Sequence, residues 1–257
     1  MRYINFNAND TPQYGTSAIF NASSFDLLFI NIEGVPQHPS TADLSNPMRR
    51  LWDLQPHPHS LSSDEAYRSM GLCPEFGKVV CATAGVLRTR LDDEQPFFVT
   101  TTYTSDDEPR LLCNISETID NFLISCEPFH YVCGHNILSA DIPFLAKRLI
   151  INHLPLPPLF DKSGKNSVSN MLIDTAVFWS MGNPEPPAPA PLLATAFGID
   201  VNLDDYDPAQ AATLFHDNKD FHALALRSQR KALVAAQIFR TIRGEKPILP
   251  DHTINKE

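Results

Sequence analysis

The feature that most constrains the fold is a nearly unbroken apolar run at residues 25–32, which ends at the breaker Gly34-Val35-Pro36. A short apolar run bounded by turn residues is typical of a buried β-strand. Two further β-rich runs follow at residues 79–86 and 97–103, and the acidic segment 92–94 between them predicts a hairpin turn. We therefore expect the chain to begin with three antiparallel strands.

The second half of the chain changes to helical spacing. Apolar residues recur every three to four positions from Ser116 to residue 126 and again at 141–151, with a strand-like segment at 131–136 between them. A short helix at 192–197 and a long one from about residue 220 to 242 complete the pattern. This order predicts an α/β fold in which a mixed sheet, antiparallel in its first three strands and then parallel, is flanked by helices.

Composition limits the possible partners. The net charge of −10 opposes indiscriminate phosphate binding, so any contact with nucleic acid requires a local basic patch. The five cysteines are odd in number and lack zinc-ligand spacing, so we interpret them as small buried residues in a reducing compartment. No run approaches the ~18 apolar residues of a membrane span, and residues 1–11 do not resemble a signal peptide. We expect a cytoplasmic protein without membrane contact.

Three oxygen-bearing side chains stand where a metal site could form. Asn31 and Glu33 lie two residues apart at the end of the first strand, so they point to one face of it. Asp141 opens the helix at 141–151. Magnesium prefers such oxygen ligands. An ordinary strand end with a solvated Glu33, and a helix cap formed by Asp141, are the competing interpretations.

Taken together, these segments resemble the predicted 3′–5′ exonuclease domains related to the proofreading domain of family B DNA polymerases, among the DEDD exonucleases of the RNase H-like superfamily. The resemblance implies that the mixed sheet has the RNase H-like arrangement. The matching blocks are Phe29–Pro36, Leu72–Cys81, Gly134–Ile137 with Asp141–Arg148, Ile173–Thr175 with Trp179, and Leu192–Ile199. The likeness covers residues 25–243, which leaves residues 1–24 as an N-terminal extension and 244–257 as a C-terminal tail.

The resemblance implies a site in which four carboxylates hold two Mg²⁺ or Mn²⁺ ions that clamp the scissile phosphate. The four acid positions fall on Asn31, Glu33, Asp141 and Lys231, and the tyrosine expected in the third motif falls on Arg227. Only Glu33 and Asp141 are acidic, so they alone remain as catalytic or metal-binding residues. A unit cation ~4 Å from a dication feels roughly 8 kcal/mol of repulsion at an effective dielectric constant of ~20. We therefore expect the Lys231 ammonium to take the place of the metal and to pair with Glu33 and Asp141.

Other polar residues receive ordinary structural assignments. We expect Asp220 to cap the last helix and Asp174 to serve as a structural hydrogen-bond acceptor. His135, His216 and His222 are interpreted as core or surface residues rather than as general bases.

Three functions stay open. The first is a catalytically impaired 3′–5′ exonuclease-family domain that binds the 3′ ends of single-stranded DNA or RNA. The second is a slow metal-dependent 3′–5′ exonuclease, and the third is a protein-interaction scaffold. The residues expected to contact nucleic acid are Asn136, Lys147, Arg148 and Arg227, where both cations of the helix at 141–151 are expected to point away from its apolar stripe of Leu145, Leu149 and Ile150.

Overall fold

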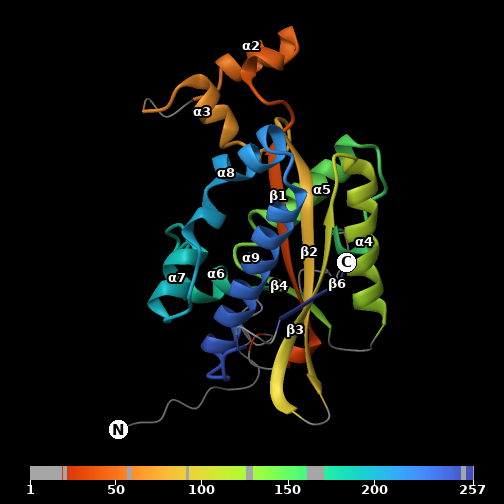
Figure 1. Cartoon of the computed structure of the whole chain (residues 1–257), viewed down its shortest axis with the longest axis vertical. Coiled ribbons are helices and arrows are strands. Elements are labelled where there is room, and N and C mark those ends of the chain that lie inside the picture. The colour runs from red at the N-terminus through yellow and green to blue at the C-terminus, as the bar shows by residue number, and fades with distance from the viewer. Residues whose placement is uncertain are drawn as a thin grey trace.

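A six-stranded mixed sheet forms the centre of the computed structural model, which describes residues 19, 22–56, 60–90, 93–125, 130–160, 171–249 and 253–256. The strand order is β5-β4-β1-β2-β3-β6. Strands β1, β2 and β3 are antiparallel neighbours, whereas β4 and β5 continue parallel to β1 and β6 runs parallel to β3. The mixed sheet flanked by helices that the sequence predicts is therefore confirmed (Figure 1). The strands are β1 (Leu27–Pro36), β2 (Gly77–Arg90), β3 (Asp93–Thr104), β4 (Tyr131–Gly134), β5 (Leu172–Asp174) and β6 (Thr253–Lys256).

Helices cover both faces of this sheet. The α-helices are α2 (Asn46–Asp53), α3 (Ser63–Arg68), α4 (Glu108–Ile124), α5 (Asp141–Ile151), α6 (Thr175–Trp179), α7 (Ala190–Ala196), α8 (Pro208–Ala212) and α9 (Phe221–Ile242). Short 3₁₀ segments are η1 (Ser24–Asp26), η2 (Thr41–Asp43), η3 (Pro158–Phe160) and η5 (Leu203–Tyr206), and η6 (Thr213–Asp217) is a π-helical turn. In Figure 1, α4 and α5 lie on one side of the sheet and α9 with α7 and α8 on the other, while α2 and α3 stand beyond one end.

The alternation of side chains along β1 decides which residues meet which helices. Leu28, Ile30 and Ile32 belong to the core beneath α4 and α5. Leu27 and Phe29 belong to the core beneath α9, where Phe29 packs edge-on against Phe98 and Phe239. Asn31 and Glu33 continue this second row, so the strand directs them toward α9.

The carboxyl end of β1 is held by a close approach of two backbones. A Cβ atom on Gly34 would lie 2.3 Å from the Gly71 carbonyl oxygen, so only glycine fits there. The register with β2 shifts between Glu33 and Gly34. The segment that follows α3 therefore packs directly against the strand end that carries Glu33.

Several boundaries differ from the sequence-based expectations. The helix expected from Ser116 begins at Glu108, where Asp107 caps it by accepting a hydrogen bond from the Arg110 N–H. Helix α2 has no counterpart among the helices expected from the sequence. Of the turn expected at residues 92–94, residue 92 lies outside the described residues, whereas residues 93 and 94 belong to β3 and Asp93 pairs with Arg90 of β2. Ile150 is 57% exposed, so its assignment to the apolar stripe of α5 is wrong, whereas Leu145 and Leu149 are buried as predicted.

The regions expected to lie outside the domain contribute to it. Residues 253–256 of the expected C-terminal tail form β6, which pairs with β3 from Phe98 to Thr101. Ile19 and Ala22, from the expected N-terminal extension, are buried in the core beneath α9. The boundaries at residues 24 and 244 are therefore wrong for these segments, because the sheet and core recruit them.

The described cysteines are all free thiols. Cys81 and Cys133 are buried as predicted, but Cys113 is exposed, and Cys126 lies outside the described residues. Among the described helices, none combines the length and the apolar character needed to cross a lipid bilayer.

Candidate functional site

The Glu33 carboxylate lies at the centre of the candidate site and is only 3% exposed. Its Oε1 atom lies 2.8 Å from the Lys231 Nζ, and its Oε2 atom accepts a hydrogen bond from the Arg227 Nε at 3.2 Å. Burying a carboxylate without partners is very costly, so two cations at hydrogen-bonding distance explain how it is tolerated. The interpretation of Glu33 as a solvated residue is wrong.

Asn31 joins the same cluster, as the shared face of the strand predicts. Its Nδ2 donates to Glu33 Oε1 and to Ser228 Oγ, both at 3.0 Å. Ser228 Oγ also accepts a hydrogen bond from Thr83 Oγ1 at 2.8 Å. An aspartate at position 31 would offer only acceptors, but here the side-chain amide donates to Glu33. Asn31 therefore fits the cation-filled cluster rather than a metal-ligand set.

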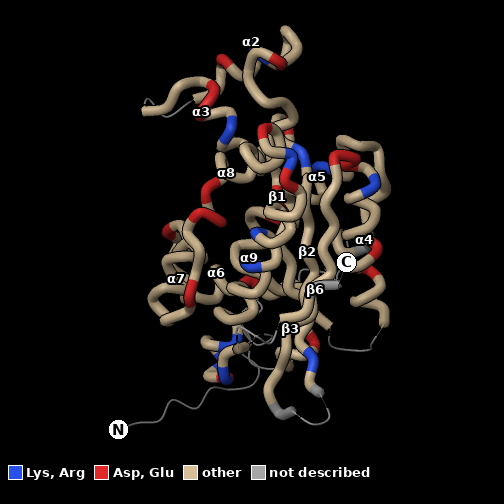
Figure 2. The backbone as a smooth tube through the Cα atoms, in the orientation of Figure 1, with Lys and Arg blue, Asp and Glu red and all other residues tan. Residues whose placement is uncertain are grey.

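Arg227 connects this cluster to the segment before α8 by hydrogen bonds. Its two terminal nitrogens donate to the carbonyl oxygens of Asp204 and Asp207 at 2.7 and 2.8 Å. One turn further on, Arg230 forms a two-pronged ion pair with Asp205. Figure 2 shows basic positions on α9 and acidic positions along the segment between α7 and α8. Arg227 is 2% exposed, so the prediction that it contacts nucleic acid is wrong.

Asp141 has a different role from the one expected. Ala140, not Asp141, is the N-cap of α5, and the Asp141 Oδ1 accepts a hydrogen bond from the Ile32 backbone N–H at 2.8 Å. Burial raises the pKa of Asp141 to about 7, although the Ile32 N–H and the positive charge of Lys231 act in the opposite direction. Lys231 and Asp141 form no ion pair, so the predicted pairing of Lys231 is confirmed for Glu33 and wrong for Asp141.

The residues present do not fit a divalent metal ion. Both oxygens of Glu33 already accept from cations or an amide, and one oxygen of Asp141 is bound to the backbone. Arg227 and Lys231 bring two positive charges to a site whose two carboxylates bring at most two negative charges. In the described part of the chain, no group of three His, Cys, Asp or Glu side chains is arranged to hold a metal.

A cavity of about 510 Å³ opens beside this cluster. Asn31, Asp141 and Lys231 line one part of it, and the proline-rich segment 186–191 lines another. The Tyr206 ring lies beside Lys231, with the Lys231 Nζ 5.4 Å from the ring centroid. Lys231 keeps 17% of its side chain exposed, so this cation reaches the cavity while it remains paired with Glu33.

The other residues expected to contact nucleic acid differ in how accessible they are. Asn136 lines the cavity and adopts a left-handed backbone conformation (φ 64°). Lys147 is exposed on α5. Arg148 is 4% exposed and binds both oxygens of Glu108, which is itself buried. The expectation that Arg148 points away from the core is therefore wrong, because a buried carboxylate on α4 draws it inward.

The structural assignments of the aspartates are confirmed. Asp174 is 6% exposed and caps α6, while it also accepts hydrogen bonds from the backbone N–H groups of Asn136 and Leu138. Asp220 caps α9 through the Ala223 N–H. Among the histidines, His135 is partly buried and bound to Thr175 and to the Ala188 carbonyl, which connects the proline-rich segment to β4.

Sequence reasoning missed Ser228, Thr83 and Tyr206. Ser228 follows Arg227 directly and precedes Lys231 by one helical turn, so helical spacing places all three on the side of α9 that faces β1. That spacing was a usable signal for Ser228. No local pattern marks Thr83 or Tyr206, because their neighbours in space are distant in sequence.

No protein-family model and no curated protein sequence matches this chain.

Proposed function

We propose that this chain is a non-catalytic 3′–5′ exonuclease-like domain that acts as a protein-interaction scaffold in the cytoplasm. The observation that carries the proposal is the clamping of Glu33 by Arg227 and Lys231. An exonuclease of the resembled kind needs negative side chains to gather two dications, whereas here two protein cations neutralise the central carboxylate. On this proposal, the domain has an exonuclease-like fold, and a structural ion cluster stands where the metal-binding site would be.

The charges favour a protein partner over a nucleic acid. Nucleic-acid affinity rests largely on cations that are free to neutralise phosphates. Arg148 and Arg227 are engaged in internal ion pairs, and Lys231 is paired with Glu33. The chain as a whole carries a net charge of −10. These facts support binding to a protein surface.

A cleavage assay combined with metal titration tests the loss of catalysis. We expect no Mg²⁺- or Mn²⁺-dependent shortening of 5′-labelled single-stranded DNA or RNA, and no change of the melting temperature when Mn²⁺ is added. The triple variant Asn31→Asp, Arg227→Tyr, Lys231→Asp restores the expected acids and should gain a Mn²⁺-dependent rise in melting temperature. Adding Glu33→Gln to that triple variant is the matched control and should weaken the gain. Metal-dependent cleavage by the unmodified chain that Glu33→Ala abolishes would refute the proposal.

The cavity beside Lys231 favours a second candidate, the binding of a nucleic-acid 3′ end without cleavage. Its volume of about 510 Å³ lies in the range of small-molecule sites, and Asn31, Asn136 and Lys231 present polar groups to it. Fluorescence anisotropy with a labelled single-stranded oligonucleotide separates the two candidates. Saturable binding that Lys231→Met weakens, and that a blocked 3′ end abolishes, selects this second candidate over the scaffold.

A further inference from the structure

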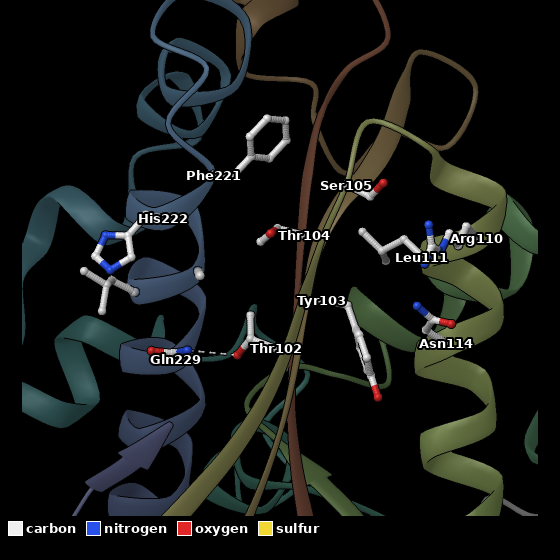
Figure 3. Close-up of a pocket in the computed structure, with 12 residues that line it drawn as sticks. Thr102, Tyr103, Thr104, Ser105, Arg110, Leu111, Asn114, Phe221, His222 and Gln229 are labelled. Carbon is white, nitrogen blue, oxygen red and sulfur yellow. Dashed lines mark hydrogen bonds between the residues drawn. The ribbon is translucent and has the colours of Figure 1, made fainter. Parts of the chain in front are cut away.

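A groove of about 590 Å³ lies on the far side of β1 from the ion cluster's cavity, between α4 and α9. Its floor is formed by residues 102–104 at the end of β3 and by Ser105, which follows the strand. In Figure 3, Thr102 and Thr104 point toward α9, whereas Tyr103 and Ser105 lie on the side of α4. The groove shares no lining residue with the cavity beside Lys231.

The floor of the groove is a sheet edge that no described strand covers. Strand β6 pairs with β3 only from Phe98 to Thr101 among the described residues. Ser105 donates its backbone N–H to the Val80 carbonyl, and hydrogen-bonded pairs alternate along an antiparallel ladder. The backbone groups of Tyr103 and Ser105 therefore face β2, and those of Thr102 and Thr104 face outward. Within the described part of the chain, nothing pairs with the outward-facing backbone of Thr104.

The strand β6 shows how this edge is used. It is an extended segment that runs parallel to β3 along the same edge, in register from Phe98 to Thr101. The groove begins at Thr102, next to Thr101, which forms the last described pair with β6. A second extended segment could thus pair with residues 102–105 as the direct continuation of an interface that the fold already contains.

The residues that form the walls of the groove determine which side chains on the added segment would fit. On the α9 side are Phe221, His222 and Leu226, and on the α4 side are Arg110 and Leu111. Successive side chains of an added strand would point alternately at these two walls. Both walls offer an apolar surface, and the α4 wall adds one exposed cation, Arg110.

Arg110 is the group that selects the partner's charge. It is exposed, and among the described residues no carboxylate lies within ion-pair distance of it. An acidic side chain on the bound segment would complement it. A second copy of this chain does not suit the groove, because α4 and α9 stand on both sides of the β3 edge and keep two such edges apart (Figure 3).

We propose that this groove binds an extended acidic segment of a partner protein by strand addition, parallel to β3 along residues 102–105. This groove would be the binding surface of the proposed scaffold. The inference rests on the scaffold function only because it takes the partner to be a protein. It does not depend on the loss of catalysis, because the groove shares no lining residue with the cavity beside Lys231. A failed cleavage prediction and a failed groove prediction are therefore distinguishable.

Defined synthetic peptides test the proposal with the full chain. The probe is a fluorescein-labelled octapeptide of alternating Val and Thr with one central Glu, compared with versions that carry Lys or Gln there. We expect saturable binding in fluorescence anisotropy, weakened roughly five- to tenfold when Glu is replaced by Lys. Arg110→Glu should reverse this preference. Arg50→Glu, the same charge change on the distant helix α2, is the matched control and should leave it unchanged.

Two further measurements are specific for strand addition. N-methylation of alternate backbone nitrogens of the peptide, in the register that faces β3, should abolish binding, whereas methylation in the other register should not. In hydrogen exchange, the peptide should slow the Thr104 amide, while the Tyr103 and Ser105 amides are already protected by β2. Equal binding of both methylated peptides, or no saturable binding by any peptide of the set, would overturn the proposal. Protection of Thr104 by self-association alone would do the same, because it would make a second copy the occupant.

Discussion

At the scale of single residues, the contacts of the candidate site serve to neutralise one buried carboxylate. A buried Glu33 carboxylate without partners would strongly destabilise the fold. Each of its two oxygens lies beside a cation from α9. Breaking a buried ion pair by removing one partner typically costs ~3–5 kcal/mol, since the other charge is left uncompensated. The cluster therefore makes Arg227 and Lys231 structural residues, whatever the domain binds.

Asp141 should give the stability of the protein a distinctive pH dependence. Its pKa is about 7 in the folded chain, above the ordinary value of 3.8. The folded state holds the Asp141 proton more tightly than the unfolded state does. The protonated side chain therefore stabilises the fold below about pH 4, and this stabilisation is lost as the pH rises toward 7. We expect the unmodified chain to lose on the order of 2–4 kcal/mol relative to Asp141→Asn between pH 4 and pH 7.

Urea unfolding of both proteins at several pH values measures this difference. The side-chain amide oxygen that Asp141→Asn introduces can still accept the Ile32 N–H, so the comparison isolates the titration. A carboxyl carbon of Asp141 that titrates near pH 4 by NMR would contradict the prediction.

At the scale of elements, the described helices and strands around the site are connected by side chains that form hydrogen bonds with the backbone of a neighbouring element. Asp174 connects the end of β5 to the start of α6 and to the turn after β4. Arg227 connects α9 to η5, and Asp141 connects α5 to β1. Each link leaves backbone groups without partners if it is removed.

The Asp174 link should be the costliest of the aspartate contacts to lose. Asp174→Ala removes the acceptor for the N–H groups of Asn136, Leu138 and Ala176, which lie at or near the core. We expect a loss of about 2–4 kcal/mol in the free energy of unfolding, measured by urea denaturation. Asp220→Ala at the exposed cap of α9 is the matched control and should cost about 1 kcal/mol. Equal losses for the two variants would show that the extra bonds of Asp174 contribute nothing.

At the scale of the whole molecule, the two ends of the chain complete the sheet and its core. Strand β6 pairs with part of the β3 edge (Figure 1). Ile248 is buried with Ile19 in the core beneath α9. An uncovered sheet edge is a site for unwanted pairing between molecules. The segment after α9 is therefore part of the domain rather than an appendage.

Removing residues 250–257 should lower stability and promote self-association. We expect the melting temperature to fall by about 4–8 °C, because a four-residue ladder worth roughly 2 kcal/mol is lost. Light scattering should show concentration-dependent aggregation as the β3 edge becomes free. Removing residue 257 alone is the control. An unchanged melting temperature in the shorter chain would show that β6 contributes no stability.

The sequence predicted the first-order architecture well. The apolar run of β1, the long amphipathic helix α9 and the short helix α7, which stops before Gly198, are local patterns, and local spacing determines them. The predictions for Arg148 and Arg227 failed for a shared reason. A charged residue on a helix looks solvent-facing until a buried carboxylate from another element, Glu108 or Glu33, is known to lie opposite.

The amino-acid sequence by itself determined which side of β1 carries Asn31 and Glu33, because alternation along a strand is a property of the backbone. It also determined that positions 31 and 231, where acids were expected, carry Asn31 and Lys231 instead. Only the tertiary structure decided that Arg227 and Lys231 both reach Glu33 while Asp141 turns to the Ile32 backbone. Those contacts join residues more than a hundred positions apart, and their distances depend on how α9 and α5 pack on the sheet.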